Sequence, residues 1–158
     1  MKKLLPVLFA FFASSSHAHD DVNRFQDWLV VGDVDSGVAA YSQVGATGSQ
    51  KTLGVYKNTG DSYVIAVTSE QLKTCMDKAN FKTQAKRHAV LAGVDTEVTI
   101  LCRGDYDGYG MEIYSDNRAI KYALDKWANK SDHLTVGEVE FSTNGFVEAY
   151  DAISTFGA

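Results

Sequence analysis

The chain has 158 residues, of which 45% are hydrophobic, and its 20 acidic residues outnumber 15 Lys and Arg residues, giving a formal net charge of −5. Phosphate backbones attract chains with an excess of Lys and Arg, so this composition argues against a nucleic-acid partner. The acidity also argues against anionic membrane surfaces. It either serves solubility alone or permits attraction to a cationic protein.

The first 18 residues have the pattern of an export signal. Lys2 and Lys3 precede ten apolar residues at 4–13, and Ser16 and Ala18 then occupy the −3 and −1 positions of a signal-peptidase site. Ten apolar residues are about half of the roughly 20 that span a bilayer. We therefore expect a signal peptide over 1–18, cleaved after Ala18, and not a membrane anchor.

Cleavage leaves residues 19–158, which fit a single globular domain that buries roughly two-thirds of its unfolded surface. Loss of Lys2 and Lys3 changes the formal net charge from −5 to −7. The short signal with its Lys-Lys start is typical of bacteria. We expect a periplasmic protein with no membrane insertion after cleavage.

Cys75 and Cys102 are the only cysteines in the chain. In an exported protein, two cysteines indicate a disulfide more than a metal site or a catalytic thiol. Closing the loop between them stabilises the fold by about 3.5 kcal/mol in the chain-entropy model. We expect the Cys75–Cys102 disulfide to form.

The first half of the chain contains short runs of strand-forming residues separated by turn signals, as in antiparallel sheets. In the first run, Trp28 and Val30 would point to one face. Leu29 and Val31 would point to the other. The predicted strands cover residues 25–31, 38–44, 51–57 and 62–67.

The middle of the chain predicts a short helix and further strands. Thr68 with Gln71 three residues later resembles a capping box, which predicts a helix over 70–78 that carries Cys75. A strand is expected near 88–91. In the next strand, over 96–102, alternate residues from Thr96 to Cys102 form the core face and would bury the disulfide.

The last third predicts two helices around a late strand. Ser115 or Asp116 can cap a helix over 117–129, residues 134–142 alternate as a strand, and Asn144 can cap a helix over 145–154. The apolar stripe of the first helix contains Ile120, Ala123, Leu124 and Trp127. The fold class predicted is therefore mainly β, an antiparallel β-sandwich-like domain with two or three peripheral helices, including a short C-terminal helix.

An acidic, glycine-rich turn connects the strand ending near Cys102 to its return strand. Its candidate partner-binding residues are Asp105, Tyr106, Asp107 and Tyr109, because aromatic side chains anchor interfaces. An ordinary tight hairpin is the alternative. The spacing also resembles a calcium loop, but Tyr109 at position 5, Glu112 at position 8 and the strand-like flanks disfavour a metal.

Glu138 and Glu140 would lie on one face of the late strand, roughly 7 Å apart. That separation is compatible with the acid/base pair of a glycosidase. An acidic partner-binding row or a solvated strand face is the alternative. His19, His88 and His133 lack zinc-site spacing, and no nucleophile elbow or phosphate-binding loop appears, so we expect no catalytic residues and no cofactor.

Two motifs stand at opposite ends of the exported chain. FQDWLV at 25–30 has the form F-x-D-W-x-V, and VEFS at 139–142 is followed by a G-F-x-x-A helix within 144–153. With the helix over 118–127, these motifs resemble the invasion-associated locus B family of small exported bacterial proteins. The chain lacks the cysteine which that family carries shortly after Trp28. The resemblance implies a compact, β-rich, disulfide-stabilised fold with no established enzymatic chemistry.

These observations predict a periplasmic, non-catalytic protein-binding domain. Its most concrete form is an inhibitor or immunity-type protein that neutralises a periplasmic or cell-wall-directed toxic enzyme, with a cationic enzyme as the expected partner. An envelope or host-association factor is the first alternative, and a glycan or peptidoglycan hydrolase using Glu138 or Glu140 is the second. The sequence leaves a homodimer open.

Overall fold

The computed structural model describes residues 21–33, 37–45, 49–58, 62–77, 79, 84–104, 108–129 and 133–156. The expected signal peptide over 1–18 lies outside them. The strands are β1 (Asp21–Phe25), β2 (Trp28–Asp33), β3 (Gly37–Val44), β4 (Lys51–Lys57), β5 (Tyr63–Ser69), β6 (Ala85–Leu91), β7 (Val94–Cys102), β8 (Gly110–Tyr114), β9 (Leu134–Val136) and β10 (Val139–Phe141). The helices are the 3-10 helix η1 (Lys73–Met76) and the α-helices α2 (Asn117–Ala128) and α3 (Phe146–Thr155).

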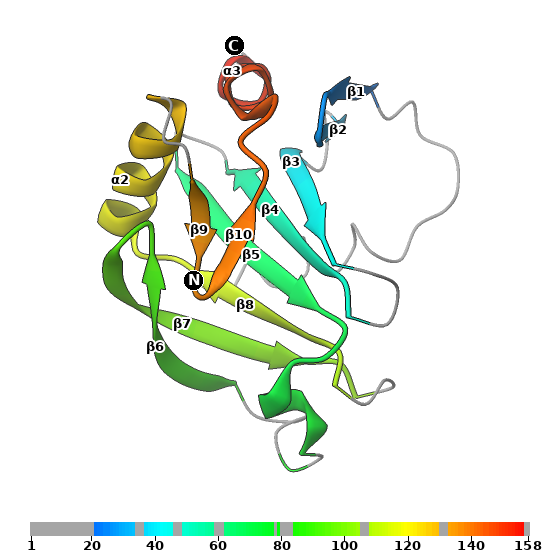
Figure 1. Cartoon of the computed structure of the whole chain (residues 1–158), viewed down its shortest axis with the longest axis vertical. Coiled ribbons are helices and arrows are strands. Elements are labelled where there is room, and N and C mark those ends of the chain that lie inside the picture. Colours follow the sequence, from blue (N-terminus) through cyan, green and yellow to red (C-terminus); the bar gives the residue numbers. More distant parts are fainter. Residues whose placement is uncertain are drawn as a thin grey trace.

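All ten strands form one antiparallel sheet in the order β1-β2-β3-β4-β5-β8-β7-β6-β9-β10. The sheet curls (Figure 1), so that β10 at one edge returns to contact β3. The helix α3 packs on β1 to β4, whereas α2 packs on β5 and β6. The predicted mainly β, sandwich-like fold with a C-terminal helix is confirmed. None of the helices in the described part of the chain has the length and apolar content needed to cross a bilayer.

The main core fills the inner face of the curled sheet, because strand side chains alternate between faces. Trp28 and Val30 are buried there, and Leu29 and Val31 on the outer face are partly exposed, as predicted. Other core residues are Leu53, Val55, Ile65, Val67, Val98, Tyr114, Ile120, Leu124, Trp127 and Ile153.

A second, smaller apolar cluster lies on the outer face of the sheet. It consists of Ala39, Tyr56, Val64, Ala66 and Met111, with Tyr41 and Ile113 packed against them. The strands β3, β4 and β5 are therefore apolar on both faces.

Two predicted strands are hairpins in the structure. The strand predicted over 25–31 is confirmed as β2 from Trp28 onward, but its start is wrong, because Gln26 and Asp27 form a turn between β1 and β2. Gln26 has a φ of 51°, a left-handed conformation that its sequence neighbourhood does not indicate. The strand predicted over 134–142 is also wrong, since Gly137 and Glu138 turn the chain between β9 and β10.

The predicted helix caps divide into one that is confirmed and two that are wrong. Asp116 caps α2, since its Oδ1 accepts hydrogen bonds from the backbone nitrogens of Arg118 at 2.8 Å and Ala119 at 3.1 Å. The capping box at Thr68 is wrong, because Thr68 is buried within β5 and the helix is only the four-residue η1. Asn144 is not the cap of α3, because Gly145 occupies that position.

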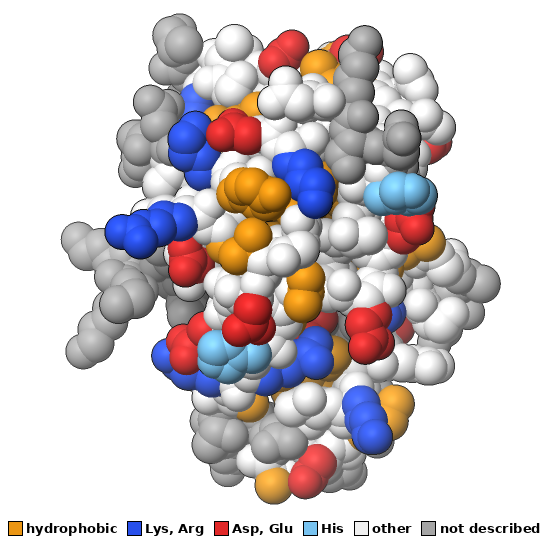
Figure 2. Space-filling view, turned by 60° about the vertical axis from the view of Figure 1, so that its left-hand side comes forward, with side chains coloured by type: hydrophobic (Ala, Val, Ile, Leu, Met, Phe, Trp, Pro, Cys, Tyr) orange, Lys and Arg blue, Asp and Glu red, His pale blue; other side chains and the backbone are white. Residues whose placement is uncertain are grey.

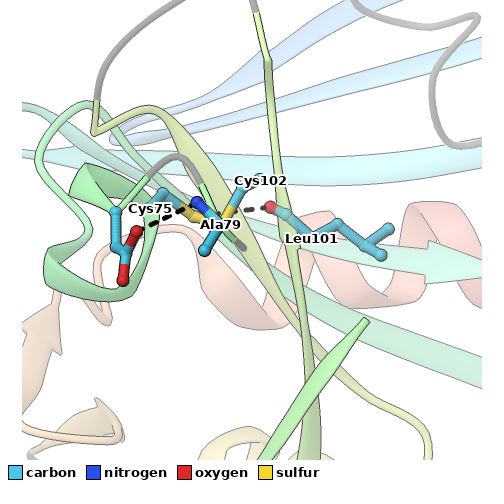
Figure 3. Close-up of a disulfide and its surroundings, with 5 residues drawn as sticks. Cys75, Ala79, Leu101 and Cys102 are labelled. Carbon is cyan, nitrogen blue, oxygen red and sulfur yellow. Dashed lines mark hydrogen bonds between the residues drawn. A yellow bond between two sulfur atoms is a disulfide. The ribbon is translucent and has the colours of Figure 1, made fainter. Parts of the chain in front are cut away.

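The predicted disulfide is confirmed. Cys75 in η1 is bonded to Cys102 at the end of β7, with their Cα atoms 5.2 Å apart, within the usual range for a disulfide (Figure 3). Cys75 is fully buried, whereas Cys102 is partly exposed, so the predicted burial of the bond holds for one half. The bond attaches the short helix to the sheet.

Candidate functional site

The predicted contact residues of the turn between β7 and β8 are described only in part. Asp105, Tyr106 and Asp107 lie outside the described residues. Tyr109 is partly exposed, and the Arg103 guanidinium lies 5.9 Å from the centre of its ring. Burial raises the pKa of the Tyr109 hydroxyl, while the charge of Arg103 opposes that rise and the charge of Glu70 adds to it.

The base of this turn is held by backbone hydrogen bonds to the segment around η1. Gly108 donates its N–H to the Cys75 carbonyl at 3.2 Å and accepts from the Leu72 N–H at 2.6 Å. Its φ of +83° favours glycine. A Cβ on Gly110 would lie 2.4 Å from the Cys75 Sγ, so this position also has no room for a side chain. The two glycines allow close packing of the turn against the η1 segment.

Glu138 and Glu140 do not share a face of one strand, contrary to the prediction. Glu138 lies in the β9–β10 turn, and the Glu140 Oε1 in β10 lies within hydrogen-bond distance of the His133 Nδ1, at 2.8 Å. Both glutamates are exposed. On the face shown in Figure 2, histidines lie beside acidic side chains, which fits this pair and the His88–Asp95 pair at 3.0 Å.

The predicted contact residues do not form one patch. Tyr109 precedes the first residue of β8, whereas the β9–β10 turn lies beside the last, since a Cβ on Gly137 would be 3.6 Å from the Tyr114 hydroxyl. The five residues of β8 extend over roughly 13 Å. A partner that covers Tyr109 therefore reaches Glu138 only if its interface spans this length.

An open cleft of about 700 Å³ lies near the first hairpin, and we call it the β1–β4 cleft. It is lined by Arg24, Asp27, Leu29, Val31, Tyr41, Ser42, Gln43, Thr52 and Ser142. Cross-strand pairing places Arg24 opposite Leu29 and Leu29 opposite Tyr41, so these three form one row across β1, β2 and β3. The pairing of β2 with β3 ends at this row, and the β1–β2 turn then separates from Ser42 and Gln43.

Tyr41 forms the aromatic wall of the cleft, and its ring packs against Tyr56. Their ring centroids are 5.6 Å apart at 85°, and a hydrogen bond joins their hydroxyls. The Tyr56 ring lies over Gly54, where a Cβ would come within 2.6 Å of it. Burial raises the pKa of Tyr41 to about 12 and also raises that of Tyr56, to which Tyr109 contributes electrostatically.

One end of the cleft is built from the β1–β2 turn and the loop before α3. The Asp27 Oδ2 accepts hydrogen bonds from the Ser142 hydroxyl at 2.6 Å and from the Asn144 side-chain amide at 3.4 Å. The Trp28 Nε1 donates to the Ser142 carbonyl at 2.9 Å. A Cβ on Gly145 would lie 2.1 Å from the Phe25 carbonyl oxygen, so only glycine permits this approach.

Ser42 borders the cleft, but its side chain points to the inner face of the sheet because it alternates with Tyr41 and Gln43. The residue is 2% exposed, and among the described residues its hydroxyl has no hydrogen-bond partner. A buried hydroxyl without a partner carries a free-energy penalty of about 1–3 kcal/mol.

Sequence reasoning did not find the cleft, because its residues come from four strands, the β1–β2 turn and the loop between β10 and α3. The available signal was the apolar pair Leu29 and Val31 on the face opposite Trp28, since an apolar outer face is unusual in a solvated strand. Among the described residues, no group of three or more His, Cys, Asp or Glu side chains gathers as a metal site. The chain matches no family model, and neither a curated protein nor a solved structure is significantly similar to it.

Proposed function

We propose that this chain is an exported, non-catalytic protein-binding domain that inhibits, or confers immunity to, a periplasmic or cell-wall-directed toxic enzyme. The observation that carries the proposal is the double backbone hydrogen bond at Gly108, which attaches the β7–β8 turn to the η1 segment beside the disulfide. A contact loop with a rigid base loses less conformational entropy when it binds than a free loop does. The rigid base therefore suits a role in recognition.

The position of Tyr109 also supports this role. Its ring is partly exposed beside the cationic Arg103, whose backbone N–H donates to the Tyr109 carbonyl at 3.0 Å. Tyr and Arg are enriched among the residues that dominate interface energies. The pair supplies an ordered aromatic contact at the base of the turn.

The charge of the chain favours a cationic enzyme as the partner. The mature chain has a formal net charge of −7, which follows from −5 for the full sequence and the loss of Lys2 and Lys3. Asp105 and Asp107 add two carboxylates at the turn. Opposite charges accelerate association and position the partner.

The test measures inhibition directly. The mature protein is added to a panel of cationic cell-wall hydrolases acting on purified peptidoglycan, in parallel with the double variant Asp105→Asn/Asp107→Asn. We expect wild type to inhibit at least one enzyme at micromolar concentration and the variant to inhibit it at least tenfold more weakly. The control Glu148→Gln/Asp151→Asn removes the same charge from exposed positions of α3 and should inhibit like wild type. Absence of inhibition, together with unchanged toxin sensitivity in a deletion strain, would refute the proposal.

A second candidate function is an envelope or host-association role like that of the invasion-associated locus B family. The observation that favours it is that the two segments carrying the resemblance contact each other. Trp28 packs on Phe146, and Asp27 accepts from Ser142. Loss of adhesion or of envelope integrity on deletion, without a change in toxin sensitivity, would favour this function. The hydrolase hypothesis on Glu138 and Glu140 has no supporting contact among the described residues and is not proposed further.

A further inference from the structure

The β1–β4 cleft has a charged wall, an aliphatic floor and a hydrogen-bonding wall. Arg24 stands on β1, the edge strand, and within the described part of the chain no carboxylate pairs with it. Leu29 and Val31 lie on the neighbouring strand and form the floor. Strands lie about 4.8 Å apart, so the Cα atoms of Arg24 and Tyr41 are roughly 10 Å apart. That width accommodates one extended chain.

The opposite wall offers amide and hydroxyl groups that are already oriented. The Gln43 Nε2 donates to the Thr52 Oγ1 at 3.3 Å, and the Gln43 Oε1 accepts from the Gln50 Nε2 at 3.2 Å. These exposed bonds exchange readily with those of a ligand. Asp27 receives both of its side-chain hydrogen bonds at Oδ2, so its Oδ1 remains an acceptor among the described residues.

These groups together select a ligand that combines a carboxylate with an aliphatic side chain. An exposed guanidinium binds a carboxylate through two parallel hydrogen bonds. The floor of Leu29 and Val31 suits an aliphatic group and offers no aromatic face on which a sugar ring could stack. Tyr41 is the only aromatic residue in the described lining, and its ring is engaged with Tyr56.

We propose that the cleft binds the C-terminal end of a short peptide. The terminal carboxylate contacts Arg24, the last aliphatic side chain lies on Leu29 and Val31, and the peptide backbone exchanges hydrogen bonds with Gln43 and Thr52. This site is separate from the β7–β8 turn and does not depend on the proposed inhibitory function.

The test is an NMR titration of the isotope-labelled mature protein with acetyl-Gly-Ser-Val-Leu as the free acid. Its C-terminal amide and a peptide ending in glycine are the comparison ligands. We expect the free acid to shift the amide signals of Leu29, Val31 and Tyr41, and to bind at least tenfold more tightly than either comparison peptide. Equal binding of acid and amide, shifts confined to other regions, or no binding at millimolar peptide would overturn the proposal.

Two variants assign the contacts to residues. Arg24→Gln should weaken binding of the free acid at least tenfold without changing the affinity for the amide. The control Arg118→Gln removes an arginine exposed on α2 and should bind like wild type. Leu29→Ala should weaken the binding of both the free acid and the amide. The midpoint of urea unfolding of each variant verifies that it is folded. Asp105→Asn/Asp107→Asn should bind the peptide like wild type, which separates this site from the turn.

Discussion

Trp28 and Phe146 pack edge to face with their ring centroids 5.0 Å apart, joining the β1–β2 hairpin to the start of α3. Phe146 also stacks on Tyr150 at 5.8 Å and meets Trp127 edge-on at 5.9 Å. One phenyl ring therefore links both helices to the sheet. The backbone that brings it there passes through Gly145, whose neighbour is the Phe25 carbonyl.

Gly145→Ala should destabilise the fold by more than about 3 kcal/mol, because left-handed strain of about 1–2 kcal/mol adds to the collision with the Phe25 carbonyl. Gly93→Ala is the matched control. Gly93 has a φ of +93°, but its nearest neighbour to a Cβ is the Lys126 Nζ at 3.9 Å, so it should show the strain alone. Urea unfolding of both variants measures the difference, and equal losses of stability would contradict the role given to Gly145.

Replacing both cysteines, as Cys75→Ala/Cys102→Ala, should lower the free energy of unfolding by about 3.5 kcal/mol in the chain-entropy model. Urea unfolding of the variant should match that of wild-type protein whose disulfide has been reduced under denaturing conditions and whose thiols have been blocked. The expected loss is in the global free energy of unfolding, since the disulfide acts by constraining the unfolded chain. A variant as stable as oxidised wild type would show that the disulfide does not stabilise the domain.

Ionisation of the Tyr41 hydroxyl should lower the free energy of unfolding at alkaline pH. Its pKa rises from 10.0 to about 12 on folding, mainly through burial. Below pH 10 both states keep the proton, and stability does not depend on it. Between pH 10 and about 12 the unfolded state alone releases it, so the free energy of unfolding falls by about 1.4 kcal/mol per pH unit. In urea unfolding between pH 9 and 11, Tyr41→Phe should show a shallower decline, and an unchanged slope would refute this assignment.

Glu112→Gln should destabilise the fold by about 1.5–3 kcal/mol, because it removes a charge-assisted contact with Arg87 from a site where Glu112 is only 12% exposed. The control Glu97→Gln breaks the Lys86–Glu97 pair, whose side chains are 61% and 54% exposed. Exposed pairs contribute about 0–1 kcal/mol. In thermal unfolding at low and high salt, the loss of stability in Glu97→Gln should be the smaller one, and only that loss should depend on the salt concentration. A larger loss of stability in Glu97→Gln than in Glu112→Gln would contradict the prediction that the less exposed pair contributes more.

The elements with local signals are the ones that the sequence predicts well. The strands over 38–44 and 51–57 follow from strand-forming runs bounded by turn signals, and α2 follows from Asp116 and an apolar stripe. The β1–β2 turn has no such signal, because Gln26 adopts a left-handed conformation without a glycine or asparagine. Gly137, by contrast, interrupts the alternation of 134–142, and a glycine inside a strand pattern is a signal for a turn. The strand prediction did not use that signal, and the structure shows the turn with a φ of +61° at Gly137.

The β1–β4 cleft could not be predicted, because its geometry depends on which strands pair. Arg24, Leu29 and Tyr41 become neighbours only through the registers of β1 with β2 and of β2 with β3. Ser142 joins them from a loop whose position is set by Trp28 and Asp27. Alternation identifies a face of each strand, but it contains no information on the long-range contacts that bring these faces together.

The hydrogen bond from Trp28 to Ser142 joins residues 114 positions apart. During synthesis, Trp28 therefore lacks its hydrogen-bond partner until nearly all of the chain has been made. Contacts this distant slow the folding of a domain. Closure of the core is consequently a late event, and a chain truncated before Phe146 should retain strands but lack the packed interior that fixes them.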